Sequence, residues 1–287
     1  MAALEFQDII YQKHHRVQGA AWVTINRPEV MNSFTGRTLA EMKEAVIDAN
    51  CDESVGVVVI TGVGDRAFCA GGDIKWLSEA QQEGRWGHGD FDPHAGIEEC
   101  LKPIIARVNG YSIGGGNHMA YFCDFTIASE KATFAQVGPR VGSPASGHYV
   151  SYLTWVVGAK KAKEMWMLCR RYTAEQALAM GLVNEVAPRD QLEAAVDRFC
   201  EEMLALSPGC LEILKAAFDQ EMDGYTEMGV ISSQMYPHWF DMPEGKEGGS
   251  AFMEKRTPEF WRLREEEETK RREFAAEYVA ARKRGKK

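Results

Sequence analysis

Two glycine-rich turns constrain the fold of this chain more than any other feature. Ala70-Gly71-Gly72-Asp73-Ile74 and Gly114-Gly115-Gly116-Asn117 each follow a short apolar run and lead toward a helical pattern. The first backbone N–H groups of a helix have no partner within it, and glycine leaves room for another molecule to approach them. Two such turns side by side would direct N–H groups at one oxygen atom. The sequence therefore predicts an oxyanion hole built from two separate segments.

Strand and helix patterns alternate around these turns. Apolar runs without polar alternation predict buried strands at 20–25, 55–61, 103–108, 125–128 and 182–186. Apolar residues at i, i+3 and i+4 spacing predict helices at 38–49, 117–123, 160–168 and 174–180. Beyond Pro188 the pattern is helical throughout. We therefore expect an α/β fold with a core over residues 1–200 and a helical C-terminal region with a basic tail over residues 201–287.

Composition excludes several classes of protein. The chain has 287 residues, of which 45% are hydrophobic and 26% charged, and this is typical of a globular protein rather than a disordered or fibrous one. No apolar stretch is long enough to span a membrane. The net charge of −9 disfavours nucleic acid as a partner, although residues 261–287, with 10 basic and 6 acidic residues, carry +4.

Cysteine and histidine usage favours a protein without a metal centre. The seven cysteines are odd in number and widely spaced, which predicts reduced thiols and a cytoplasmic location. Neither C-x-x-C nor H-E-x-x-H spacing occurs. We expect no structural or catalytic metal.

Two other glycine patterns suggest competing functions. Gly62-Val63-Gly64-Asp65-Arg66-Ala67 is similar to a dinucleotide-binding fingerprint, but the glycine pair at 71–72 opposes the helix that the fingerprint requires. Gly110-Tyr111-Ser112-Ile113-Gly114 matches the nucleophile elbow of serine hydrolases. Because the turn continues through Gly116, Ser112 would precede the loop rather than occupy its apex, and a structural role is favoured.

The two turns and their flanking residues resemble the crotonase (enoyl-CoA hydratase/isomerase) superfamily. The resemblance rests on residues 68–74 (FCAGGDI), 106–116 (ARVNGYSIGGG) and 123–128 (CDFTIA), and extends from about residue 6 to residue 260. It implies a spiral of ββα repeats with a C-terminal helical trimerisation region, assembled as a trimer or a dimer of trimers. It also implies a CoA thioester substrate and no tightly bound cofactor. The enolate oxygen would be bound by the N–H groups of Gly72 and Gly115.

Further segments resemble one branch of the superfamily, the dihydroxynaphthoyl-CoA synthases and 2-ketocyclohexanecarboxyl-CoA hydrolases. These segments are residues 134–143 (FAQVGPRVGS), 168–172 (LCRRY) and 252–260 (FMEKRTPEF). The branch acts on cyclic acyl-CoA substrates. The resemblance implies that CoA contacts Arg27, Lys255 and the turn formed by Ala70, Gly71, Gly72, Asp73 and Ile74.

The chain departs from the family at its proton-transfer positions. His118 and Gly138 occupy the positions of the two glutamates of the hydratases, and Ala145 and Phe240 occupy those of an aspartate and a tyrosine of the branch. Because histidine titrates near neutrality, we expect His118 to act as acid or base. Ser143 and His148 are further catalytic candidates, and His88 and His94 are weaker ones.

The sequence thus predicts an acyl-CoA lyase that hydrates or dehydrates a cyclic or unsaturated acyl-CoA. The first alternative is ring-opening carbon-carbon hydrolysis of a cyclic β-ketoacyl-CoA. A non-catalytic CoA- or RNA-binding homologue is the alternative from another class, suggested by the lost acid-base residues and the basic tail.

Overall fold

Two sheets form the core of the molecule. The computed structural model describes residues 5–82, 94–143, 145, 148–226 and 242–284. A six-stranded sheet has the order β1-β2-β3-β5-β7-β10, with strands Ile9–Lys13, Ala20–Ile25, Val57–Gly62, Ile104–Val108, Phe125–Ser129 and Glu185–Ala187. A four-stranded sheet has the order β4-β6-β8-β9, with strands Ala67–Cys69, Tyr111–Ile113, Thr133–Ala135 and Arg171–Thr173. Pairing is parallel except for β1 with β2 and β8 with β9.

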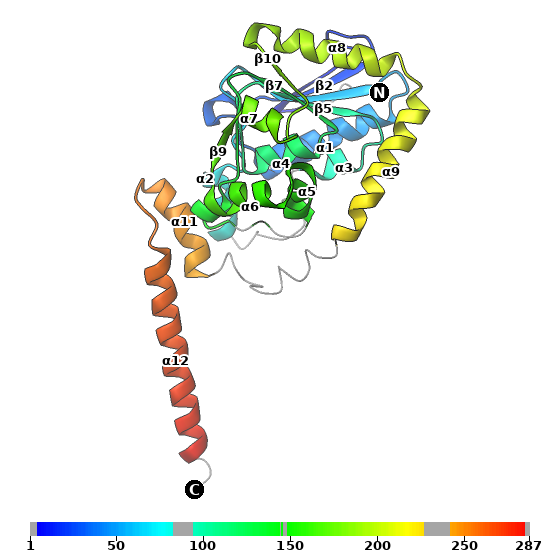
Figure 1. Ribbon diagram of the computed structural model, residues 1–287. Helices are drawn as coiled ribbons and strands as arrows, with labels where there is room; N and C mark the ends of the chain where they lie inside the picture. The colour runs from blue at the N-terminus through cyan, green and yellow to red at the C-terminus, as the bar shows by residue number, and fades with distance from the viewer. Residues whose placement is uncertain (1–4, 83–93, 144, 146–147, 227–241, 285–287) are drawn as a thin grey trace.

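From β3 to β8, successive strands alternate between the two sheets, and each pair of strands is followed by a helix or helical turn. The pair β3 and β4 leads into α2 (Ile74–Gln82), and β5 and β6 lead into α4 (Gly115–Phe122). The pair β7 and β8 leads into the 3-10 turn η2 (Gly138–Arg140), α5 (His148–Val157) and α6 (Ala159–Leu168). This arrangement, visible in Figure 1, is the spiral of ββα repeats expected from the sequence.

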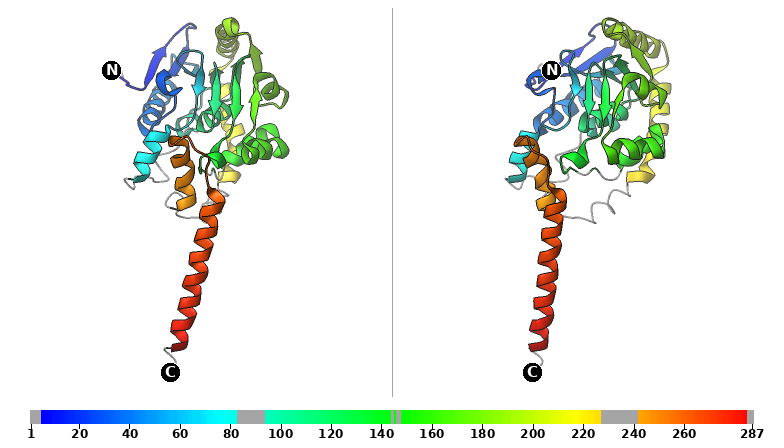
Figure 2. Two further views of the ribbon diagram at one scale, coloured as in Figure 1. Left: turned by 90° about the vertical axis from the view of Figure 1, so that its left-hand side faces the viewer. Right: turned by 60° about the vertical axis from the view of Figure 1, so that its left-hand side comes forward.

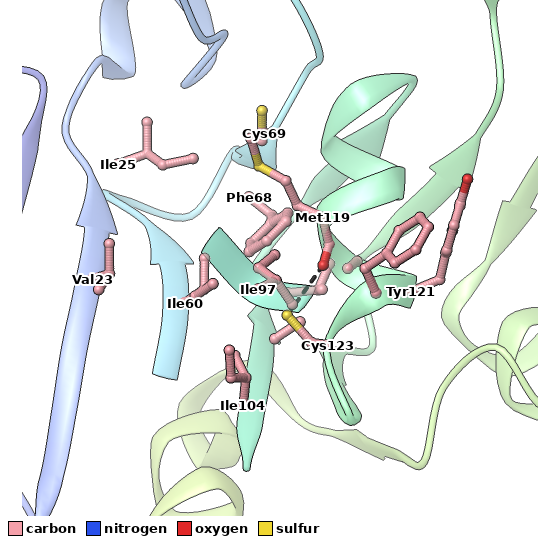
Figure 3. Close-up of a cluster of buried hydrophobic side chains, with 14 of the residues drawn as sticks. Val23, Ile25, Ile60, Phe68, Cys69, Ile97, Ile104, Met119, Tyr121 and Cys123 are labelled. Carbon is pink, nitrogen blue, oxygen red and sulfur yellow. Dashed lines mark hydrogen bonds between the residues drawn. The ribbon is translucent and has the colours of Figure 1, made fainter. Parts of the chain in front are cut away.

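The main core lies between the sheets and the helices on their inner side. Figure 3 shows Ile60 of β3, Phe68 of β4, Ile104 of β5 and Met119 of α4 in one buried cluster. The helix α1 (Gly36–Cys51) buries Leu39, Met42, Ala45, Val46 and Ala49, the residues whose spacing predicts it. Helix α8 (Leu192–Leu204) covers a second cluster on the opposite face of the large sheet.

The remaining helices are α3 (Ala95–Glu98), α7 (Ala174–Ala179), α9 (Pro208–Thr226), α11 (Pro243–Met253) and α12 (Phe260–Arg284), with 3-10 turns η1 (Pro28–Val30) and η3 (Arg189–Gln191). The buried Lys215 of α9 pairs with Asp124 at 2.8 Å and fixes this helix to the body. The domain boundary predicted after residue 200 falls inside α8. Among the described residues, no helix has both the length and the apolar character needed to cross a membrane.

The long predicted elements are confirmed, whereas the short strands escape sequence analysis. Strands β4, β6, β8 and β9 have three residues each, too few for a pattern to stand out. The strand predicted at 182–186 is shorter, at Glu185–Ala187, and α4 begins at Gly115 rather than near Asn117. The helix starts earlier because Gly114, with φ of 57° and ψ of −121°, completes the turn before it.

Candidate active site

The structure brings the two glycine turns together. A Cβ atom placed on Gly71 would lie 3.0 Å from the carbonyl oxygen of Ile113 and 3.5 Å from the nitrogen of Gly115. Gly71 also has a φ of +96°, which side-chain-bearing residues rarely adopt. The predicted juxtaposition of the two turns is therefore correct, and Gly71 permits it both by its conformation and by its lack of a side chain.

The surrounding backbone leaves one N–H group in each turn available. Phe34 accepts from the N–H of Asp73 at 2.8 Å and donates to the carbonyl of Gly71 at 2.9 Å, so it holds both neighbours of Gly72. Gly115 is the first residue of α4, where no intrahelical acceptor exists. Within the described part of the chain, neither Gly72 nor Gly115 donates its N–H to an acceptor. These are the two donors that the sequence predicts for an oxyanion.

The second turn is closely packed from below. A Cβ on Gly115 would lie 2.5 Å from the ring of Phe34, and one on Gly116 would lie 2.0 Å from the carbonyl oxygen of Cys69. Burial raises the pKa of the Cys69 thiol to about 12, so this group stays neutral and unreactive near neutral pH. The turn that carries the Gly115 donor is therefore packed against the ring of Phe34 and the backbone of Cys69.

Arg27 and Asp73, both predicted CoA contacts, pair with each other. The Arg27 guanidinium lies 3.0 Å from the Asp73 carboxylate and also donates to the carbonyl of Ser33. The other Asp73 oxygen accepts from the N–H groups of Lys75 and Trp76 in the first turn of α2. Their side chains thus hold the first glycine turn, between Ala70 and Ile74, and their contact with CoA stays a prediction.

His118 lies one helical turn after the Gly115 donor, and aromatic rings pack against it. The residue is 8% exposed, and its ring stacks on Tyr149 at a centroid distance of 5.4 Å. Trp166 lies 5.5 Å away and Tyr121 lies 5.6 Å away. Burial raises the pKa of Tyr121, whose hydroxyl donates to the carbonyl of Tyr149. His118 is therefore a nearly buried titratable side chain on the helix that begins with the Gly115 donor.

The second glutamate position, Gly138, has no room for a side chain. A Cβ there would lie 2.2 Å from the carbonyl oxygen of Ser143 and 3.9 Å from the Trp166 ring. Ser143 donates its N–H to the carbonyl of Gly138, so the two residues are neighbours. Ala145 packs against the main core. The side chains of His148 and His88, like Phe240, lie outside the described residues.

Sequence analysis did not identify two buried polar side chains beside Gly138. Gln136 is fully buried and precedes Gly138 by two residues, and Trp166 faces the Gly138 position. Among the described residues, neither the Gln136 amide nor the Trp166 indole N–H has a hydrogen-bond partner. A buried polar group without a partner is costly, which makes these two side chains candidates for contact with a water molecule or a polar group of a ligand. Neither side chain stands out in the sequence, because burial is what makes it unusual.

His94, a weaker candidate, is also fully buried. Its ring stacks on Phe122 at 4.0 Å and its Nδ1 lies 2.7 Å from the carboxylate of Glu98. The Tyr149 ring lies 4.5 Å from that of His94 and also stacks on the ring of His118. His94 therefore packs against Tyr149, one of the aromatic rings that contact His118.

The two competing glycine motifs do not form the sites that they suggest. Ser112 is fully buried in β6 and donates its hydroxyl to the carbonyl of Gly116 at 3.2 Å, unlike an exposed nucleophile. The segment after Gly64 continues into β4 rather than into a helix.

Lys255, a predicted CoA contact, is exposed, with a φ of 56°, two residues after α11. In the described ranges, no group of three or more His, Cys, Asp or Glu residues could hold a metal ion.

Comparison with known proteins identifies the family. The model of the enoyl-CoA hydratase/isomerase family matches residues 15–262. An enoyl-CoA hydratase from Mycobacterium avium subsp. paratuberculosis K-10 is 29% identical, with a TM-score of 0.74 over 89% of this chain and 99% of its own. A carnitinyl-CoA hydratase from Mycobacterium avium is 29% identical, with a TM-score of 0.76 over 88% and 98%. An enoyl-CoA hydratase subunit from Geobacillus kaustophilus HTA426 is 30% identical, with a TM-score of 0.69 over 90% and 99%.

These relatives share the spiral that places Gly72 and Gly115 side by side, and proteins of this superfamily use CoA thioesters as substrates without a tightly bound cofactor. The chain belongs to the enoyl-CoA hydratase/isomerase family of the crotonase superfamily.

Proposed function

We propose that this enzyme hydrates or dehydrates a cyclic or unsaturated acyl-CoA through a thioester enolate. The observation that carries the proposal is the pair of N–H groups on Gly72 and Gly115, both without an acceptor in the described chain, with His118 one helical turn beyond them. An enolate oxygen bound by both donors would be stabilised as its charge develops. The loss of one such donor typically raises a barrier by about 2.7 to 4 kcal/mol.

His118 supplies the proton transfer in this proposal. In hydration, water attacks the β-carbon, electrons move to the thioester oxygen, and a proton is then delivered to the α-carbon. A glutamate cannot replace Gly138 in this structure, because its Cβ would collide with the carbonyl oxygen of Ser143. Gln136, two residues before Gly138, and Trp166, whose ring faces that position, carry buried polar atoms without a partner in the described chain, and in this proposal they bind the reacting water. His118 is then the group that accepts or returns the proton.

Ring-opening hydrolysis of a cyclic β-ketoacyl-CoA is the second candidate. Tyr149, Tyr121 and Trp166 pack around His118, and we propose that these aromatic surroundings favour a flat or alicyclic acyl group. In this reaction, the bound water would attack the ring ketone, and the same two donors would stabilise the enolate that leaves when the carbon-carbon bond breaks.

The proposal includes the binding of CoA and the assembly of the enzyme. CoA contacts would come from Lys255 and from the turn that Arg27 and Asp73 hold. We propose a cytoplasmic homotrimer or dimer of trimers formed through the C-terminal helices. Ser143 and His148 remain secondary catalytic candidates in this proposal.

A substrate screen tests the reaction. Purified protein is incubated with linear and cyclic enoyl-CoA and β-ketoacyl-CoA thioesters, and products are analysed by mass spectrometry and by titration of new carboxylates. Addition of water without a new carboxylate supports hydration, whereas addition with one supports ring opening. Absence of turnover with every thioester, together with retained CoA binding, would favour the non-catalytic alternative.

A substitution at His118 tests its role. We expect His118→Ala to lower kcat by about 10² to 10⁴-fold, because general acid-base catalysis contributes about this much, while CoA affinity is unchanged. Steady-state kinetics and CoA titration measure both quantities. His15, which contacts Trp22 outside the site, offers a matched control, and His15→Ala should retain full kcat. Normal turnover by His118→Ala would show that another residue moves the proton.

A further inference from the structure

Phe34 contacts both of the turns that carry the proposed donors, and it is fully buried. Its N–H donates to the carbonyl of Gly71 at 2.9 Å and its carbonyl accepts from the N–H of Asp73 at 2.8 Å, which makes a parallel bridge with Gly72. Parallel pairing of this kind uses the N–H groups of alternate residues, so the N–H of Gly72 itself points away from Phe34. The backbone of Phe34 thus orients the first donor.

The ring of Phe34 packs against the second turn. A Cβ atom placed on Gly115 would lie 2.5 Å from the Cζ atom of the ring and 2.6 Å from its Cε1 atom. The far edge of the ring is therefore in contact with Gly115, the residue whose N–H is the second donor. A shorter side chain at position 34 would leave a gap at this point, because the interior of a protein is closely packed. The side chain of Phe34 thus supports the second donor.

The position of Phe34 is itself fixed through both of its neighbours in the sequence. The carbonyl of Ser33 accepts from the Arg27 guanidinium. Thr35 caps helix α1, and its side chain accepts from the N–H of Thr38. Phe34 therefore lies between two anchored residues. From this position it holds the first turn by hydrogen bonds and the second by van der Waals contact.

We propose that Phe34 is a positioning residue that sets the separation of the Gly72 and Gly115 donors. The inference rests on the proposed function, in which both donors bind the thioester oxygen. Such donors act at about 2.7 to 3.1 Å from the oxygen. A misplacement of about 1 Å can lower a rate by about 10²-fold. A purely structural role in the core is the competing explanation, and it predicts a loss of stability without any change at the bound carbonyl.

Infrared difference spectroscopy tests the positioning. The probe is butanoyl-CoA with an isotope label at the thioester carbonyl, because this saturated thioester cannot be hydrated. In the wild-type protein the carbonyl band should move to lower frequency on binding, since the two donors polarise the bond. Phe34→Leu should lose most of this displacement with little change in affinity for butanoyl-CoA, and its kcat on the substrate found in the screen should fall by about 10²-fold. Phe34→Met, whose chain reaches nearly as far as the ring, should retain most of both.

Phe125→Leu is the matched control, because it removes the same ring from the cluster on the opposite face of the large sheet. This variant should lower the melting temperature and keep the full displacement of the carbonyl band. A full displacement in Phe34→Leu, beside a lowered melting temperature, would overturn the role of Phe34 and leave the proposed function standing. A wild-type spectrum without any displacement would overturn the proposed oxyanion hole, and this inference with it.

A substitution in the second turn tests the same contact without shortening Phe34. Gly115→Ala keeps the donor N–H but adds a Cβ that would overlap the Phe34 ring, so it should reduce the displacement of the carbonyl band. Combining it with Phe34→Leu, which removes the edge of the ring, should recover part of the displacement, because contacting residues couple. A full displacement in Gly115→Ala, or a double variant no better than either single one, would overturn the inference.

Discussion

At the scale of single residues, glycine determines what the site can do. Gly71 allows two loops to meet, and Gly116 allows α4 to begin directly above Cys69. The sequence predicts these roles from the position of each glycine after a strand. It cannot show that Gly138 is equally constrained, because the contact with Ser143 depends on how the following loop folds back.

A pair of glycine substitutions tests this packing. Gly116→Ala should destabilise the protein by about 3 kcal/mol or more, because the new Cβ would overlap the carbonyl of Cys69, a backbone atom that cannot move freely. Gly209→Ala is the control, since its Cβ would meet nothing within 4 Å on the exposed first turn of α9, and it should raise stability by about 0.5 kcal/mol. Urea unfolding measures both. Equal stability of the two variants would contradict the described packing.

At the scale of elements, one carboxylate joins α11 to the start of α12. Glu247, only 8% exposed, accepts from the Arg256 guanidinium and from the N–H of Glu259. The hydrogen bonds from Arg256 lower the pKa of Glu247 to about 2. The two helices follow from sequence patterns, but this connection between them does not, because glutamate and arginine are common surface residues throughout the tail.

The lowered pKa predicts a pH-dependent contribution to stability. Because the carboxylate is favoured in the folded state, Glu247 stabilises the fold fully above pH 4.5, its ordinary pKa, and this contribution is lost as the pH falls toward about 2. Glu247→Gln should therefore lower the melting temperature near pH 7, and its difference from the wild type should shrink across that acidic window. Calorimetry at a series of pH values measures this. A difference independent of pH would mean that shape, not charge, matters at this position.

At the scale of the whole molecule, the body and the C-terminal helix differ in charge and in contacts. Residues 261–287 carry 10 basic and 6 acidic residues, whereas the whole chain has a net charge of −9. The body packs around two sheets, and α12 extends from it beside α11 (Figure 2). The acidic body must hold a polyanionic CoA through local positive charge, which Arg27 can supply only in part because Asp73 pairs with it.

Truncation after Arg264 separates these two parts. Because α12 contacts the body only near its start, we expect the melting temperature of the body to change by no more than about 2 °C. Differential scanning fluorimetry measures this temperature. A large drop would show that the body depends on α12.

The sequence by itself determined the fold class, the order of the long elements and the positions of the two glycine turns. These depend on local patterns: apolar runs, helical spacing and glycines that follow strands, each legible within about ten residues. Only the tertiary structure decided what surrounds His118, why Gly138 cannot carry a carboxylate, and that Gln136 and Trp166 are buried beside it. Such properties arise between segments distant in sequence, where packing determines which polar atoms lose water and which find a partner.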